Sequence, residues 1–215
     1  MTTMTPSQNE VEHSGAMPLH HFLRSRRSIR IFKPDAISDE IIRRAIETAS
    51  YAPSAHNRQP WRFAVISDSN VKLQLADAMG NRFRDDLLGD KFPAEEIEAR
   101  ITLSRNRILA APAVIILCLD PSEMDTYPDE KRKKAEFMMA VQSAAAAGQT
   151  LLLALHAEGI SSVWTCGPLF APDVIIDTLH LPKSWEPQAM FFIGFSTAPA
   201  KSKSVLPLDK ISIWF

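Results

Sequence analysis

The clearest helical pattern in the chain lies between residues 39 and 49. Apolar residues recur there every three or four positions and so share one face, namely Ile41, Ile42, Ala45, Ile46 and Ala49. Ser38 stands where a side chain can cap the first turn, and Asp39 and Glu40 follow, where carboxylates interact favourably with the helix dipole. The pattern therefore predicts an amphipathic helix over 39–49.

Apolar and β-branched runs predict the strands. The run Ala113–Leu119 is apolar throughout, which is typical of a strand buried on both faces. The run Trp61–Ser67 is aromatic and β-branched, and it also predicts a strand. The remaining expected segments are strands at Ser161–Thr165 and Ala189–Phe195, helices at 71–79 (entered at Ser69) and 172–179, and helical pieces with a loop over 81–107. Together these segments predict an α+β fold.

The longest expected helix runs from Asp129 to Glu158. Its second half, Ala144–Leu155, is apolar on nearly every side, so we expect it to be buried all round. Gly159 is well placed to end it. We expect no apolar run to approach the ~20 residues that span a bilayer. The chain closes on the apolar segment Ile211–Phe215, which is expected to pack on another surface.

Composition indicates an ordinary soluble protein. With 215 residues, 46% of them hydrophobic, the chain can bury a sizeable core, and we expect one domain over 18–215 after a loose polar tail over 1–17. That tail has no signal-peptide core. The net charge of -1 gives no overall attraction to nucleic acid or to an anionic membrane. Cys118 and Cys166 lie in apolar surroundings, which predicts two buried, reduced thiols of a cytoplasmic protein.

The segment Arg26–Phe32, the arginine segment, holds three arginines and a serine within five residues. In an extended chain alternate side chains share a face, so Ser28 and Arg30 are expected on one side and Ile29 and Ile31 on the other. Guanidinium groups match a phosphate bidentately and stay charged at any working pH. The segment therefore indicates an anion site anchored on a core. For a basic run alone, a solvated turn or nonspecific nucleic-acid contact is the alternative.

The stretch Tyr51–Pro60, the polar loop, ends the first helical pattern with prolines and a cluster of small and amide residues. It leads into the strand that begins at Trp61. A loop rich in donors and acceptors, lying between a helix and a core strand, is typical of a ligand-binding wall. Within it, His56 could contact a substrate, but a solvent-exposed or backbone-bonded histidine is the expected reading.

Four segments spread along the chain share the motifs of one protein family. They are "RRSIRIF" at 26–32, "APSAHNRQPWRF" at 52–63, "GISSVW" at 159–164, and "FIGF" at 192–195 with Lys201 and Lys203 beyond it. Together they resemble the nitroreductase family of flavin enzymes, from about Leu19 to the C-terminus. Within that family, 127–132 and 181–187 look most like the flavin domain attached to the γ-glutamyl ligase of deazaflavin coenzyme biosynthesis. That domain reduces a dehydro precursor of the coenzyme, and no ligase domain is found in these 215 residues.

The resemblance implies a nitroreductase-like fold with a central mixed or antiparallel sheet flanked by helices. It places the long helix at the interface of an obligate homodimer that the C-terminal arm embraces. It also implies FMN as cofactor and NAD(P)H as co-substrate, with ping-pong hydride transfer to a conjugated or aromatic acceptor. No catalytic side chain is needed, because the flavin carries the redox chemistry. No metal is expected either, since His20 and His21 have no further ligand at suitable spacing.

The resemblance also gives the candidate residues their roles. Cations at the phosphate and donors along the ribityl chain would come from Arg26, Arg27 and Ser28. Arg30 would lie near N1 and O2 of the ring, where a positive charge stabilises the reduced flavin. Arg27 as a surface salt-bridge partner is the alternative.

The other candidates lie further along the chain. Pro53, Ser54 and Ala55 would reach the ring from the partner subunit, with Asn57 supporting their loop. The backbone of Thr165, Cys166 and Gly167 would approach N5, and Lys203, or else Lys201, would close on the phosphate. Two other functions stay open on the sequence alone. One is a different flavin reaction of the superfamily, such as fragmenting the flavin to a vitamin-B12 ligand, and the other is a non-catalytic flavin-binding module.

Overall fold

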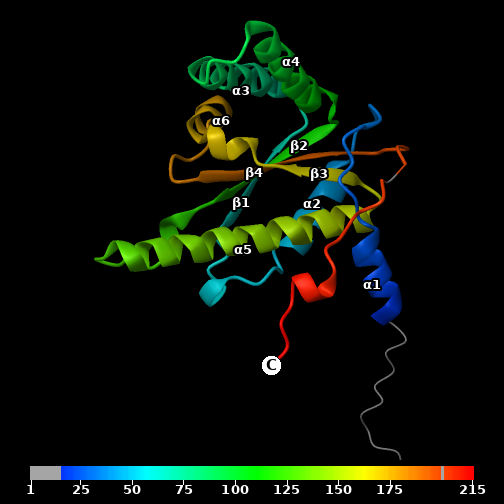
Figure 1. Ribbon diagram of the computed structural model, residues 1–215, viewed down its shortest axis with the longest axis vertical. Coiled ribbons are helices and arrows are strands. Elements are labelled where there is room, and N and C mark those ends of the chain that lie inside the picture. Colours follow the sequence, from blue (N-terminus) through cyan, green and yellow to red (C-terminus); the bar gives the residue numbers. More distant parts are fainter. Residues whose placement is uncertain (1–15, 200) are drawn as a thin grey trace, which may run out of the picture.

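One four-stranded sheet organises the computed structural model, which describes residues 16–199 and 201–215 (Figure 1). The strands are β1 (Trp61–Ile66), β2 (Ala113–Leu119), β3 (Ser161–Thr165) and β4 (Glu186–Gly194). Their order in the sheet is β1-β2-β4-β3, and all three pairings are antiparallel. The α+β fold and all four strands are thus confirmed. β4 begins at Glu186, three residues before the expected start at Ala189.

The two central strands bury both of their faces, which explains their continuous apolar sequence. In β2, Ile115 and Leu117 face one hydrophobic cluster, whereas Val114 and Ile116 face a second cluster on the other side of the sheet. All seven residues of β2 are buried. The sheet is therefore the middle layer of three.

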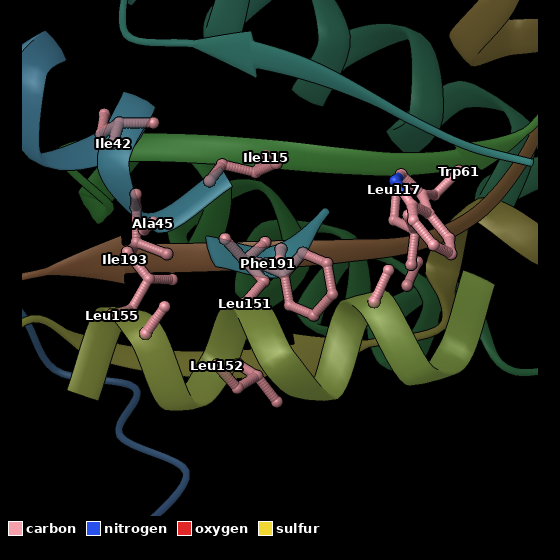
Figure 2. Packing of buried hydrophobic residues seen from close by; sticks show 14 of the residues in the cluster. Ile42, Ala45, Trp61, Ile115, Leu117, Leu151, Leu152, Leu155, Phe191 and Ile193 are labelled. Carbon is pink, nitrogen blue, oxygen red and sulfur yellow. The ribbon is translucent and has the colours of Figure 1, made fainter. Parts of the chain in front are cut away.

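The first outer layer consists of α2 (Asp39–Ala49) and α5 (Glu130–Ala157). Leu151 and Leu155 of α5 and Ile42 of α2 point at the sheet, where they meet Phe191 and other buried side chains (Figure 2). The Ser38 cap is confirmed, because its side chain accepts a hydrogen bond from the Ile41 amide at 3.4 Å.

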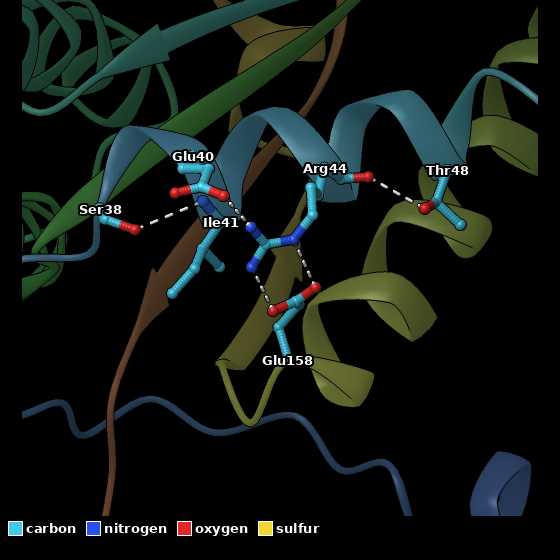
Figure 3. Close-up of polar contacts among 6 residues, drawn as sticks. All are labelled: Ser38, Glu40, Ile41, Arg44, Thr48 and Glu158. Carbon is cyan, nitrogen blue, oxygen red and sulfur yellow. Dashed lines mark hydrogen bonds and ion pairs between the residues drawn. The ribbon is translucent and has the colours of Figure 1, made fainter.

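A bidentate ion pair ties these two helices together (Figure 3). Arg44 of α2 donates to both carboxylate oxygens of Glu158, at 3.1 and 3.0 Å, just after the end of α5. Its remaining nitrogen donates to Glu40 at 2.7 Å. These contacts fix the C-terminal end of α5 against α2, one residue before Gly159 reverses the chain in a left-handed conformation (φ 73°).

The expected burial of the second half of α5, Ala144–Leu155, on every side is wrong for a single chain, since Ala145 and Gln149 are exposed there. Ala144, Ala147, Leu151 and Leu155 are buried, but a stripe on the opposite side is exposed, namely Met138, Gln142, Ala145 and Gln149. The helix is also long and apolar enough to cross a membrane by length and composition, contrary to expectation, yet half of its apolar window is buried inside the molecule. Such burial is typical of the core helix of a soluble protein.

The second outer layer contains α3 (Ser69–Gly89), α4 (Ala94–Ala110) and α6 (Pro172–Leu179). The helix expected over 71–79 continues ten residues further, to Gly89, and its cap is Asp68. The extension forms a hairpin with α4 that encloses its own small core of Leu87, Ile97 and Ile101. The hairpin projects beyond the sheet (Figure 1).

Both ends of the described chain lie on the α5 side of the sheet (Figure 1). Helix α1 (Ala16–Ser25) takes up the last two residues of the tail expected over 1–17, and residues 1–15 lie outside the described part of the chain. The C-terminal tail carries one short turn, η5 (Leu208–Lys210). Its apolar side chains are exposed, with Trp214 84% accessible, so nothing in the described part of the chain covers them.

Candidate functional site

The arginine segment lies beside β3, at the edge of the sheet. Ser28 forms a parallel bridge with Ser162, and the Ile29 amide donates to the Ser162 carbonyl at 3.0 Å. Further along, the Lys33 amide donates to the Phe195 carbonyl at 2.7 Å. These bonds hold the segment extended without making it a full strand.

The expected alternation of side chains holds only in part. Ile29 is half-buried, but Ile31 is 72% exposed and does not anchor the segment. Phe32 packs against the core instead, at the point where its ring approaches Gly194 so closely that a Cβ there would lie 2.9 Å from it. The anchor is therefore one residue later than the pattern predicted. Ser28 and Arg30, as expected for ligand contacts, are exposed.

Arg26 carries a buried nitrogen without a partner. Its Nη1 has no hydrogen bond among the described residues, although it is shielded from solvent. Burial, and then the neighbouring charge of Arg27, lower the pKa of the Arg26 guanidinium. A buried, unsatisfied donor is costly, so this atom marks a place where an anion would be stabilised.

Arg27 is used differently. Its guanidinium donates to the carbonyls of Arg24, Arg26 (2.9 Å) and Lys201 (3.1 Å), and to no carboxylate of the described residues. The contact with Lys201 crosses 174 positions of sequence and brings the C-terminal tail to the arginine segment. Lys201 and Lys203 are both exposed in this tail. The backbone of the tail at Lys201 thus lies beside the arginine segment.

A histidine that the sequence analysis did not single out supports this cluster. Ser25 Oγ lies 2.7 Å from His156 Nε2, and the Phe22 ring stacks on the His156 ring with centroids 5.1 Å apart. Burial, and then the charge of Arg26, lower the pKa of His156. No local pattern could have revealed this contact, since Ser25 and His156 lie 131 residues apart.

The far end of β3 holds the second group of candidates. Thr165 Oγ1 donates to the Met190 carbonyl at 3.0 Å, which fixes the last residue of the strand. Cys166 follows with an exposed thiol, so its expected burial is wrong, whereas Cys118 is buried as expected. Gly167 begins the short helix η4 (Gly167–Phe170), and a Cβ there would lie 3.4 Å from Met79 of α3. At about 3.3 Å per residue, Thr165 lies ~10 Å along the strand from Ser162.

The polar loop has a strained backbone and lies elsewhere. It contains the turn η2 (Ala55–Asn57), and His56, Asn57 and Gln59 all have φ near 50°. The Ser54 hydroxyl accepts from the Gln59 amide at 3.0 Å, and the Asn57 side chain accepts from that of Gln59 at 3.2 Å. These bonds hold the loop in shape. His56 itself is exposed, as expected.

The loop rests on the middle of α5 rather than near the arginines. The Ala55 amide donates to the Ser143 hydroxyl at 3.2 Å, and Pro53 is exposed. The loop leads into β1, at one edge of the sheet, whereas the arginine segment borders β3 at the other edge. Three strand spacings, about 14 Å, separate those edges. One chain therefore brings together the arginines, β3 and Lys201, but not Pro53–Asn57.

The donors at β3 suit a phosphorylated cofactor better than a metal or a nucleophilic mechanism. The described residues contain no group of three or more His, Cys, Asp or Glu side chains placed to hold a metal ion. They do contain an unpartnered guanidinium nitrogen, a free arginine at Arg30 and tail lysines. An FMN phosphate fits this positive set, since guanidinium–phosphate hydrogen bonds are charge-assisted.

Comparison with known proteins agrees with this geometry. The model of the nitroreductase family matches residues 23–195, most of the chain. A protein of Archaeoglobus fulgidus, provisionally named an NADH dehydrogenase/NAD(P)H nitroreductase, is 33% identical over 140 residues, which are 65% of this chain and 62% of that protein. An NADH dehydrogenase of Thermus thermophilus is 26% identical over 213 residues, which cover 88% of this chain and 92% of that enzyme.

A solved structure extends the similarity to the fold. A provisionally named nitroreductase of Desulfovibrio desulfuricans, crystallised in complex with FMN, superposes with a TM-score of 0.69 at 25% sequence identity. The superposition covers 92% of this chain and 96% of that one. The four motifs, the α+β fold with its long helix and the family match agree, and the chain belongs to the nitroreductase family.

Proposed function

We propose that this protein is an FMN-dependent oxidoreductase that uses NAD(P)H to reduce a conjugated or aromatic acceptor. The observation that carries the proposal is the buried Nη1 of Arg26, which has no partner among the described residues and lies in a cluster of positive charge beside β3. The FMN-bound relative and the NADH dehydrogenase and nitroreductase relatives support the cofactor and the co-substrate.

The residues of the β3 edge would hold the cofactor. Arg26 Nη1 would bind the phosphate, and Ser28 would donate beside it, with Lys203 or Lys201 closing over the phosphate from the tail. Arg27 would contribute mainly by holding that tail in place, because its guanidinium already donates to the Lys201 carbonyl. Bound FMN supplies the redox chemistry, since its ring accepts and returns a hydride.

The ring would lie toward the far end of β3. The backbone of Thr165, Cys166 and Gly167 would approach N5, and the exposed guanidinium of Arg30 would lie near N1 and O2, where it stabilises negative charge. NAD(P)H and the acceptor would bind in turn, in a ping-pong cycle.

The complete site would need a second copy of the chain. The polar loop is one sheet-width away from the arginine segment of its own chain, so Pro53, Ser54, Ala55 and Asn57 would serve the partner's cofactor. The exposed stripe on α5 and the uncovered apolar tail support such a homodimer. The unpaired thiols of Cys118 and Cys166 support a reducing compartment such as the cytoplasm.

A finer candidate within this function is reduction of the dehydro precursor of the deazaflavin coenzyme. The segments 127–132 and 181–187, which resemble the ligase-associated flavin domain, favour it. Lys183 and Trp185 of the second segment line a groove together with Phe137 and Met138, which follow the first segment along α5. We propose this groove as the place where the precursor would bind.

A turnover experiment tests both levels. The FMN-loaded protein is mixed anaerobically with NADH or NADPH and with either the dehydro deazaflavin precursor or a generic nitroaromatic. Reduction of the nitroaromatic alone would support the general function and remove the finer candidate. FMN binding without oxidation of either nucleotide would instead indicate a non-catalytic flavin-binding module and overturn the proposal.

A further inference from the structure

A cavity of about 600 Å³ opens between the α3–α4 hairpin and η4, on the face of the sheet opposite α5. This cavity, the hairpin pocket, is not formed by the arginine segment or the polar loop. Gly167 lines one end of it. The pocket therefore reaches the C-terminal end of β3 from the side of the sheet that carries α3 and α4.

The walls of the pocket suit a flat apolar ligand. Met79 and Phe83 of α3, Leu103 of α4 and Phe170 of η4 line it. Phe170 is 75% exposed and Leu103 is 52% exposed, so considerable apolar surface is available to a ligand. Pockets that bind aromatic molecules have walls of this kind, with a few polar groups that fix the orientation.

Two of the three arginines that line the pocket are already neutralised by carboxylates. Arg82 donates to Asp173 of α6 at 3.0 Å, and the charge of Asp86 also favours its protonated form. Arg100 donates to Glu96, one turn earlier in α4, at 3.0 Å. Neither guanidinium is free to select a ligand by charge.

The third arginine, Arg107, is free. It lies one turn after Leu103 and Ser104 on the same face of α4 and lines the pocket. No hydrogen bond or ion pair engages its side chain among the described residues. It is exposed, so its five donors remain available.

The two helices of the hairpin run antiparallel in a fixed register. Ion pairs join Arg105 to Asp77 at 2.7 Å and Arg84 to Glu98 at 2.9 Å. In both pairs the two residue numbers have the same sum. Any residue of α4 therefore lies beside the residue of α3 whose number completes that sum. This register gives the position of each charged residue of α4 relative to the residues of α3 along the pocket.

Arg107 lies level with Leu75, at the end of the pocket nearest the sheet. Met79, one turn further along α3, lies beside Gly167 at that same end, since a Cβ at Gly167 would be 3.4 Å from the methyl group of Met79. The nearer carboxylate of the pocket, Asp86, lies eleven residues from the level of Arg107, about 16 Å along the helix. A ligand of one or two rings beside Gly167 would therefore meet one unpaired positive charge, that of Arg107, while the Asp173 carboxylate is already paired with Arg82.

We propose that the hairpin pocket binds an aromatic or conjugated carboxylate, and that Arg107 selects it by pairing with the acid group. The pocket's role as the acceptor site rests on the proposed function, because only then does the flavin ring lie near Gly167. The binding preference itself rests on the cavity, its apolar walls and the position of the one free guanidinium.

Two probes of nearly equal shape test the charge selection. The dissociation constants of 4-nitrobenzoate and 4-nitrobenzamide are measured by calorimetry on the FMN-loaded protein, and kcat/KM is measured for both with NAD(P)H. The wild type should bind the acid more tightly. Arg107→Gln should weaken binding of the acid about tenfold and leave the amide nearly unchanged, as expected for loss of a charge-assisted contact that stays solvent-accessible.

Arg105→Gln is the matched control. It removes the same charge from the same helix, but Arg105 pairs with Asp77 and does not line the pocket. Arg107→Glu should reverse the preference in favour of the amide. Equal affinity of the wild type for the two probes, or equal effects of Arg105→Gln and Arg107→Gln, would overturn the proposal. Acid-selective binding by a protein whose flavin is reduced by neither NADH nor NADPH would keep the pocket and refute the proposed function. Turnover of both probes without acid preference would support the proposed function and refute the charge selection.

Discussion

Replacing Arg26 with methionine should weaken FMN binding without weakening the fold. The substitution keeps an aliphatic chain of similar length and removes the guanidinium, whose Nη1 is buried without a partner. If that atom binds the FMN phosphate, the variant loses a charge-assisted hydrogen bond. Such bonds contribute about 1.5–3 kcal/mol, so the dissociation constant should rise about tenfold to a hundredfold.

The flavin-free protein should respond in the opposite direction. A buried donor that makes no hydrogen bond costs roughly 1–3 kcal/mol of desolvation, and Arg26 is half-buried, which puts its cost at the low end. Removing it should therefore leave the free energy of unfolding unchanged or slightly higher. The pKa of His156 should rise, because the charge of Arg26 is the second cause, after burial, that lowers it.

The assay is a fluorescence titration of flavin-free protein with FMN, combined with denaturant unfolding and an NMR titration of His156. Arg24→Met is the matched control, since it removes the same charge from the exposed end of α1, two residues earlier. FMN affinity that is equal in the Arg26 and Arg24 variants would refute the reasoning. So would a marked loss of stability in Arg26→Met, which would mean that the guanidinium is structural.

Three other predictions concern the ring, the second copy and the core. Arg30→Gln should lower the flavin midpoint potential by about 20–65 mV, if about 1–3 kcal/mol of charge stabilisation is lost, and an unchanged midpoint in spectroelectrochemistry would show that Arg30 does not face the ring. Deleting Lys210–Phe215 should weaken self-association and release FMN together, whereas a stable flavin-loaded monomer of the full chain in sedimentation would contradict the homodimer. Gly148→Ala should cost about 1–3 kcal/mol in denaturant unfolding, because a Cβ there would lie 2.6 Å from the Trp164 ring. Gly89→Ala, with no atom within 4 Å of its Cβ, is the control, and equal midpoints for the two variants would contradict the packing.

The sequence was sufficient for elements whose signals are local. The Ser38 cap and the apolar stripe of α2 depend on residues within one or two turns, and both are confirmed. The same holds for β2, and for α5, whose cap is Asp129 and whose end at Gly159 follows from its positive φ. Those features need no knowledge of the rest of the chain.

Features that depend on tertiary packing were missed or misjudged. The extension of α3 to Gly89 carries many charges, and its few apolar residues make sense only with Ile97 and Ile101 of α4 opposite. The burial of α5 was overestimated because composition does not say which side of a helix lacks a neighbour. For the same reason, the exposure of Cys166 could not be read from its apolar surroundings, nor that of Ile31 from its alternation with the arginines.

The candidate site also combines features that local sequence predicts with features that depend on tertiary packing. The motif located the three arginines, but only the fold separates their environments: Arg26 has a buried free nitrogen, Arg27 holds the tail, and Arg30 is exposed. The contact of Ser25 with His156 joins two helices that have no common sequence signal. Sequence patterns thus predict the kind of site, whereas only the packing of the chain shows which contacts each arginine makes.

The most direct test of the central claim is an anaerobic titration of the purified, FMN-loaded protein with NADH and with NADPH, followed by absorbance. If the protein is an FMN-dependent NAD(P)H oxidoreductase, the visible flavin band should bleach stoichiometrically with at least one of the nucleotides and return when an aromatic acceptor is added. A flavin band that persists with an excess of both nucleotides, or a purified protein that cannot be loaded with FMN, would contradict the account.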